Sequence, residues 1–79
     1  ITNKKESGGI RVGDTLTPDG LSWGVIEKQY PKIKPGEGLV VVGFSENDRV
    51  VVKLEGGGVE ELLGEPDVVL YFFYRKFSR

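Results

Sequence analysis

The sequence contains no cysteine, histidine, methionine or alanine. Without histidine or cysteine the chain cannot build a Ser-His-Asp triad, a thiolate nucleophile, an imidazole base or a usual zinc site. The absence of cysteine also removes disulfides as a source of stability. We therefore expect a non-enzymatic protein, and we predict no catalytic residue, no cofactor and no bound metal.

The composition is also poor in helix formers. Alanine, the strongest helix former, is absent, whereas eleven valines, four isoleucines and three threonines supply β-branched side chains that pack well on a sheet. Twelve glycines and four prolines can form the turns between short strands. With 79 residues the chain forms one small domain with a marginal core. These features together predict an all-β domain.

Neither charge nor hydropathy points strongly to nucleic acid or membrane. Eleven basic and twelve acidic side chains give a net charge of −1, so no overall field attracts the protein to nucleic acid or to an anionic membrane. The longest apolar run, from Val68 to Tyr74, is far shorter than the roughly 20 residues of a membrane-spanning helix. We expect no transmembrane segment. The first residue is Ile1, which fits either a removed presequence or a piece of a longer chain.

Turn-forming residues divide the chain into a tail and five expected strands. Residues 1–9 are polar and end in two glycines, which predicts a flexible N-terminal tail before a domain over residues 10–79. A long loop is expected over residues 29–38, because two prolines and two glycines exclude a central strand there. A helical turn is expected only over residues 59–63. The expected strands cover residues 10–16, 21–28, 39–44, 49–54 and 68–77.

This order of elements resembles the Src-homology-3-like small barrels over residues 10–77. Its most specific local match is Val12-Gly13-Asp14 followed by residues 23–27, which is similar to the opening of the KOW-type barrels of ribosomal and elongation-factor proteins. The resemblance implies a small five-stranded antiparallel barrel with one short helical turn before the last strand. Similar barrels occur as peripheral subunits of photosynthetic electron-transfer complexes. This implies a plastid location, peripheral to a membrane complex, with the cytoplasm as the alternative.

The long loop contains the first group of candidate binding residues. Lys28, Lys32 and Lys34 surround Tyr30, so a positive patch with an aromatic ring at its centre is expected. Such a patch suits an acidic protein partner, a lipid headgroup, or single-stranded nucleic acid stacked on the ring. The alternative is a solvated loop with Ile33 in the core. We include Tyr30, Lys32 and Lys34 among the predicted partner-binding residues.

The expected last strand contains the second group. A strand over residues 68–77 directs one set of aromatic side chains into the core and leaves the other set at the surface, where a partner is expected to cover them. The alternative is that the tail or the helical turn covers them. The predicted partner-binding residues in this stretch are Leu70, Phe72, Tyr74, Arg75, Lys76 and Arg79.

Two further patterns are interpreted as ordinary surface. The carboxylates over residues 60–67 lack the close alternation of oxygen ligands that a cation site needs, and the glycine runs at 36–38 and 56–58 match no phosphate-binding loop. The sequence therefore predicts a non-enzymatic accessory subunit that binds other protein subunits of a larger assembly, for which the resemblance suggests a photosystem. The alternative is a small barrel that binds RNA or other single-stranded nucleic acid.

Overall fold

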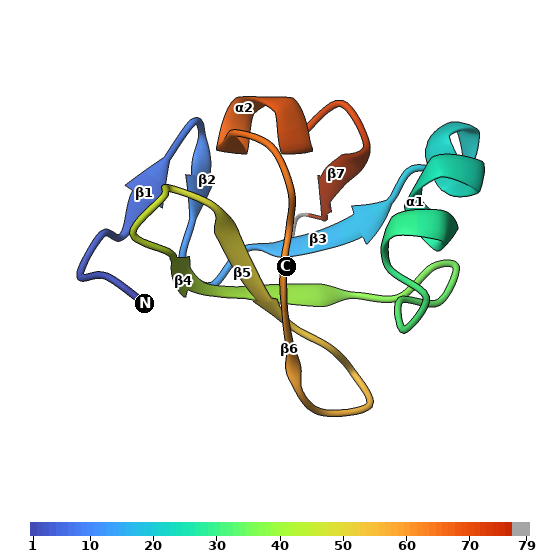
Figure 1. Ribbon diagram of the computed structural model, residues 1–79, viewed down its shortest axis with the longest axis horizontal. Helices are drawn as coiled ribbons and strands as arrows, with labels where there is room; N and C mark the ends of the chain where they lie inside the picture. The colour runs from blue at the N-terminus through green and yellow to red at the C-terminus, as the bar shows by residue number, and fades with distance from the viewer. Residues whose placement is uncertain (77–79) are drawn as a thin grey trace.

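The computed structural model describes residues 1–76, with Lys76 described by its backbone alone, and shows a predominantly β protein (Figure 1). The larger sheet is antiparallel, with the strand order β6-β5-β4-β3-β7. No pairing between β6 and β7 occurs within residues 1–76, so the described sheet is open and not a closed barrel. Its strands are β3 (Thr15–Pro18), β4 (Leu39–Phe44), β5 (Val50–Lys53), β6 (Val59–Glu61) and β7 (Phe73–Lys76).

A separate two-stranded sheet is formed by β1 (Glu6–Ser7) and β2 (Ile10–Arg11). The first of these strands lies in the segment predicted as a flexible tail. In the structure this segment contacts the larger sheet, because Thr2 N donates to Phe44 O at 2.9 Å. Lys4 and Ser7 both donate to the carboxylate of Asp48, at 3.0 and 2.9 Å. The segment therefore lies against the β4–β5 connection, and its flexibility in solution stays a prediction.

The strand predicted over residues 21–28 is wrong. The structure has a 3-10 turn, η1 (Gly20–Ser22), followed by the helix α1 (Trp23–Gln29). The Asp19 side chain accepts a hydrogen bond from Leu21 N at 3.0 Å and caps the start of this segment. Ile26 and Tyr30 then share the inner face of the helix, where they are 1% and 7% exposed. Burial of that face outweighs the β propensity of the individual residues.

The predicted elements near the C-terminus are also displaced. The helical turn predicted over residues 59–63 is wrong, because residues 59–61 form β6, which pairs with β5. The single strand predicted over residues 68–77 is wrong in its first part, because the helix α2 (Pro66–Val69) occupies that part and β7 begins at Phe73. Pro66 stands at the first helical position, where its missing N–H costs nothing. A short helical turn precedes the last strand, but it is α2 and not the predicted residues 59–63. The strand alternation predicted for residues 68–77 does not apply to Leu70 and Phe72.

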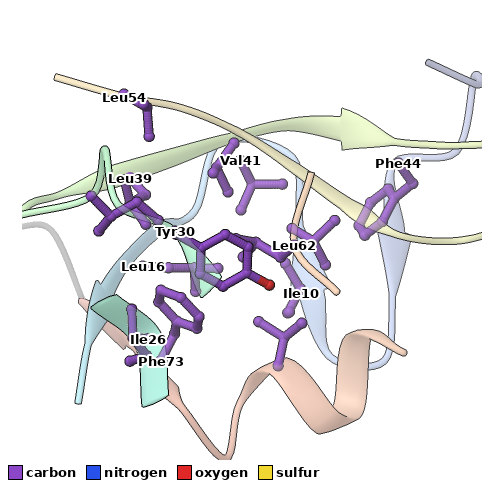
Figure 2. Close-up of a cluster of buried hydrophobic side chains, with 14 residues drawn as sticks. Ile10, Leu16, Ile26, Tyr30, Leu39, Val41, Phe44, Leu54, Leu62 and Phe73 are labelled. Atoms are coloured by element: carbon purple, nitrogen blue, oxygen red, sulfur yellow. The ribbon is translucent and has the colours of Figure 1, made fainter. Parts of the chain in front are cut away.

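The hydrophobic core packs α1 against the inner face of the sheet. Figure 2 shows the Tyr30 ring in the middle of this cluster, beside Phe73 and Ile26. The rings of Tyr30 and Phe73 meet edge to face, with their centroids 6.2 Å apart. Because this contact joins α1 to β7, it fixes the position of the helix relative to the last strand. The other core side chains include Ile10, Leu16, Leu39, Val41, Phe44, Val50, Val52, Leu62 and Val69.

Candidate functional site

An apolar groove lies between α1 and the segment that runs from β6 through α2 to β7. In Figure 1 this segment rises through the centre of the view, and α1 lies to its right. The groove has a volume of about 240 Å³. This is below the roughly 300–1,000 Å³ of small-molecule sites, so the groove suits one large apolar side chain. It is lined by Val25, Ile26, Gln29, Tyr30, Leu63, Gly64, Val69, Phe72 and Phe73.

Two of the residues that line this groove have exposed apolar side chains, and a third exposed apolar residue, Leu21, lies in the 3-10 turn that leads into α1. Leu21 is 97% exposed, and Val25 and Leu63 are each 54% exposed. Leu21 and Val25 are four residues apart, so they lie on one side of the helical segment. Asp19 N donates to Phe72 O at 2.8 Å, which holds the start of that segment beside the opposite wall of the groove. Contiguous apolar surface of this kind is typical of interaction sites.

The hydroxyl of Tyr30 connects the floor of the groove to the end of β6. It accepts a hydrogen bond from Leu63 N at 2.6 Å. Burial raises the pKa of Tyr30 above its usual value, and the charge of Glu60 acts in the same direction, against the opposing effects of the Leu63 hydrogen bond and of Arg49. The hydroxyl is therefore protonated at neutral pH and holds Leu63 against α1.

One edge of β6 pairs with no other strand of residues 1–76, and β6 runs up to this groove. Leu62 N donates to Val50 O at 2.8 Å, and Leu54 N donates to Gly58 O at 3.0 Å. Because hydrogen-bonded pairs alternate along an antiparallel ladder, Val59 and Glu61 direct their N–H and C=O groups away from β5. Leu63 N–H is the next donor in this outward row, and Tyr30 already accepts it. Among residues 1–76, the backbone groups on this edge that no strand pairs with are thus those of Val59 and Glu61.

The border of the groove on the side of β6 and α2 is acidic. Residues 59–67 contain four carboxylates and no basic residue. Glu61 and Glu65 are exposed, and Glu60 is half-buried and close enough to influence the pKa of Tyr30. Arg49, in the connection between β4 and β5, is the basic residue whose charge reaches Tyr30. The local balance of charge is therefore negative.

Lys32 and Lys34 line a second cleft of about 280 Å³, which has no lining residue in common with the groove. The cleft also contains Glu37 and Glu55, so its charge is mixed. Glu37 is only 6% exposed, and its carboxylate accepts from Lys34 N at 2.8 Å and from Glu55 N at 2.7 Å. These bonds hold the loop after α1 against the β5–β6 hairpin. Glu37 gave no sequence signal of burial, because it stands between two glycines in a polar loop.

The structure separates the predicted partner-binding residues. Tyr30 and Phe72 come together in the groove, but the ring of Tyr30 is buried and cannot serve as an exposed stacking surface. Leu70 is half-buried and packs against the core. Tyr74 is 54% exposed on β7.

Arg75, a predicted partner-binding residue on β7, is not among the residues that line the groove. Arg75 Nη1 donates to Gly9 O and lies 3.5 Å from the carboxylate of Asp14, so this side chain ties β7 to the region around β2. Lys76 belongs to β7, and Arg79 lies outside the described residues. The sequence analysis missed Val25 and Leu63 as surface residues of a site, because each was assigned to the wrong type of element.

The part of the chain that the structure describes contains neither a membrane-spanning helix nor a metal-ligand cluster. Over residues 1–76 no helix is long and apolar enough to cross a membrane. The same residues contain no group of three or more carboxylates placed to share a metal ion. Comparison with known proteins finds no matching family model, no matching curated protein and no matching solved structure. The groove and its surroundings are therefore the features of the described residues that indicate a function.

Proposed function

We propose that this protein is a non-enzymatic accessory subunit that binds another protein subunit through the apolar groove. The observation that carries this proposal is the exposure of Val25 and Leu63 in the lining of a groove that also contains the aromatic residues Tyr30, Phe72 and Phe73. Aromatic and large aliphatic side chains are enriched in the cores of protein interfaces, and a partner side chain inserted in such a pocket supplies much of the binding energy. Burial of this surface by a partner would remove it from water.

The proposed architecture is a Src-homology-3-like small barrel. Its support is the five-stranded antiparallel order together with the helical turn between β6 and β7. On the same resemblance we propose that the larger assembly is a membrane-bound photosynthetic electron-transfer complex in a plastid, such as a photosystem, with this chain at its periphery. The support for the type of assembly is architectural, whereas the support for a protein partner is the groove itself.

The test is the fate of the complex when a charge is placed in the groove. Val25→Glu and Leu63→Glu, introduced in cells that carry the protein, should shift it from a large complex to the free chain on a native gel, because a buried unpaired carboxylate is costly. Val12→Glu is the matched control, since Val12 is 37% exposed and lies between β2 and β3. Unchanged migration of both groove variants, each shown by circular dichroism to be folded, would exclude the groove as the docking surface.

A further inference from the structure

We infer that the partner contributes an extended segment that adds to β6, at the edge of the sheet formed by residues 1–76. This segment places one large apolar side chain in the groove, with lysine or arginine on its flanks. This inference rests on the proposed function and specifies the chemistry of its partner. It depends on three independent features of the same region: the backbone groups of β6, the volume of the groove and the charge around it.

The outward backbone groups of β6 determine where a partner strand could pair with this protein. Val59 and Glu61 direct their N–H and C=O groups to the open side, and β5 is the strand that pairs with β6 within residues 1–76. An unpaired edge is a template for an added strand. Pairing would end at Leu63, because its N–H already donates to Tyr30. An added segment therefore leaves β6 at the place where the groove begins.

The groove determines which side chain the added segment needs beside the end of β6. Its volume of about 240 Å³ accommodates a single Leu, Phe or Trp side chain. The aromatic rings of Tyr30 and Phe73 lie at its base, and the exposed side chains of Val25 and Leu63 stand on opposite walls. A side chain held between these walls is shielded from water on several sides. The side chains that supply most of the binding energy in protein interfaces lie in such desolvated pockets. One anchor residue next to a short stretch of strand pairing is the expected pattern.

The charges around the edge of β6 determine which charge is favoured on the residues that flank the partner's strand-forming segment. Carboxylates of Glu60, Glu61, Glu65 and Asp67 accompany β6 and α2. The facing elements contribute three basic residues: Arg49 before β5, Lys53 on β5, which pairs with Val59, and Lys28 on α1. They also contribute the acidic residue Glu27 on α1. The excess is negative, so basic flanks on the partner segment would be attracted and acidic flanks repelled. Such charges at the rim act mainly on the association rate and on the choice of partner.

The probe is a set of synthetic peptides of about nine residues, a usual strand length, with alternating Val and Thr, a central Leu, Phe or Trp, and two lysines at each end. Added to the isotope-labelled full chain, at least one should slow hydrogen exchange at the amides of Val59 and Glu61. Replacing the four lysines by glutamates should weaken binding about tenfold or more. Methylating the alternate peptide nitrogens that face β6 should abolish it, because the added strand then lacks its donors.

Protein variants complete the design. Leu63→Glu should lose the peptide, and the folded control Val12→Glu should bind it as the unmodified chain does. The inference is overturned if no peptide protects these two amides, if acidic flanks bind as well as basic ones, or if single-stranded RNA gives the same protection. The groove variants can lose the cellular complex while no peptide protects the two amides. That combination refutes strand addition, but the groove remains supported as the docking surface. Retention of the complex in those variants refutes the proposed function itself.

Discussion

Tyr30 joins the core of the protein to the end of β6 through a single hydroxyl group. Its ring is 7% exposed, and its oxygen accepts from Leu63 N at 2.6 Å. Tyr30→Phe keeps the ring in the core but leaves that backbone donor without its protein acceptor. We expect this substitution to lower the free energy of unfolding by about 1–2 kcal/mol. Urea denaturation monitored by circular dichroism measures the change.

Tyr74→Phe is the control for this experiment. It makes the same chemical change at a side chain that is 54% exposed, so its effect should stay within about 0.5 kcal/mol. Equal stability of the two variants would show that the Tyr30 hydroxyl contributes nothing to holding β6. Loss of stability in Tyr30→Phe alone would agree with the proposed bond.

The burial of Tyr30 could not be decided from the sequence. Its three neighbouring lysines and two nearby prolines are typical of an exposed loop. The spacing of Trp23, Ile26 and Tyr30 also fits the inner face of a helix, which is the arrangement observed. A segment this short fits both the helical period of about 3.6 residues and the strand period of two, because Trp23 and Val25 would also lie on one face of a strand. Packing of the segment against β7 settles the choice, and that contact is distant in the sequence.

At the scale of elements, the N-terminal segment over residues 1–9 depends on Asp48. This residue has a φ of 61° and accepts hydrogen bonds from Lys4 and Ser7. These bonds, the one from Lys4 first, lower the pKa of Asp48 below its usual value of 3.8. A carboxyl whose pKa is lower in the folded state stabilises that state above the unfolded pKa. The stabilisation is lost as the pH falls through the folded pKa.

Asp48→Asn tests this attachment without disturbing the backbone, since asparagine tolerates a positive φ. The variant should unfold at a lower urea concentration than the unmodified chain at pH 7. That difference should shrink as the pH falls below 3.8 and disappear once the pH lies below the lowered pKa of the folded state, where the carboxyl of the unmodified chain is protonated. If the two chains differed in unfolding urea concentration by the same amount at every pH in this range, the charge of Asp48 would not contribute to the attachment of the N-terminal segment.

The sequence predicted some elements well and others poorly, for identifiable reasons. The valine-rich strands β4 and β5 were expected at residues 39–44 and 49–54, close to their observed bounds. β6 was assigned to a helical turn because two glutamates and a leucine favour helix locally. Its pairing with β5 outweighs that preference. α2 was not predicted, although Pro66 stands at its first position, to which proline is well suited.

At the scale of the whole molecule, the groove is assembled from three separate stretches of chain. Its lining comes from residues 25–30, 63–64 and 69–73, which meet because α1 packs on β7 and β6 ends beside both. Each stretch taken alone gives no indication of a shared cavity. The sequence could therefore predict exposed apolar surface in the C-terminal part, but not its position between two edges of one sheet.

The distribution of charge over the whole molecule argues for protein and against nucleic acid as the partner. The net charge is −1, the predicted stacking ring of Tyr30 is buried, and Lys32 and Lys34 share their cleft with Glu37 and Glu55. We expect no detectable binding of uridine-rich single-stranded RNA at about 50 mM salt, measured by fluorescence anisotropy. Binding to phosphates would show as an affinity that falls linearly with salt on logarithmic axes. Such a slope, lost in Lys32→Ala/Lys34→Ala, would establish the nucleic-acid alternative, because only loop lysines that contact phosphate release counterions when the RNA binds.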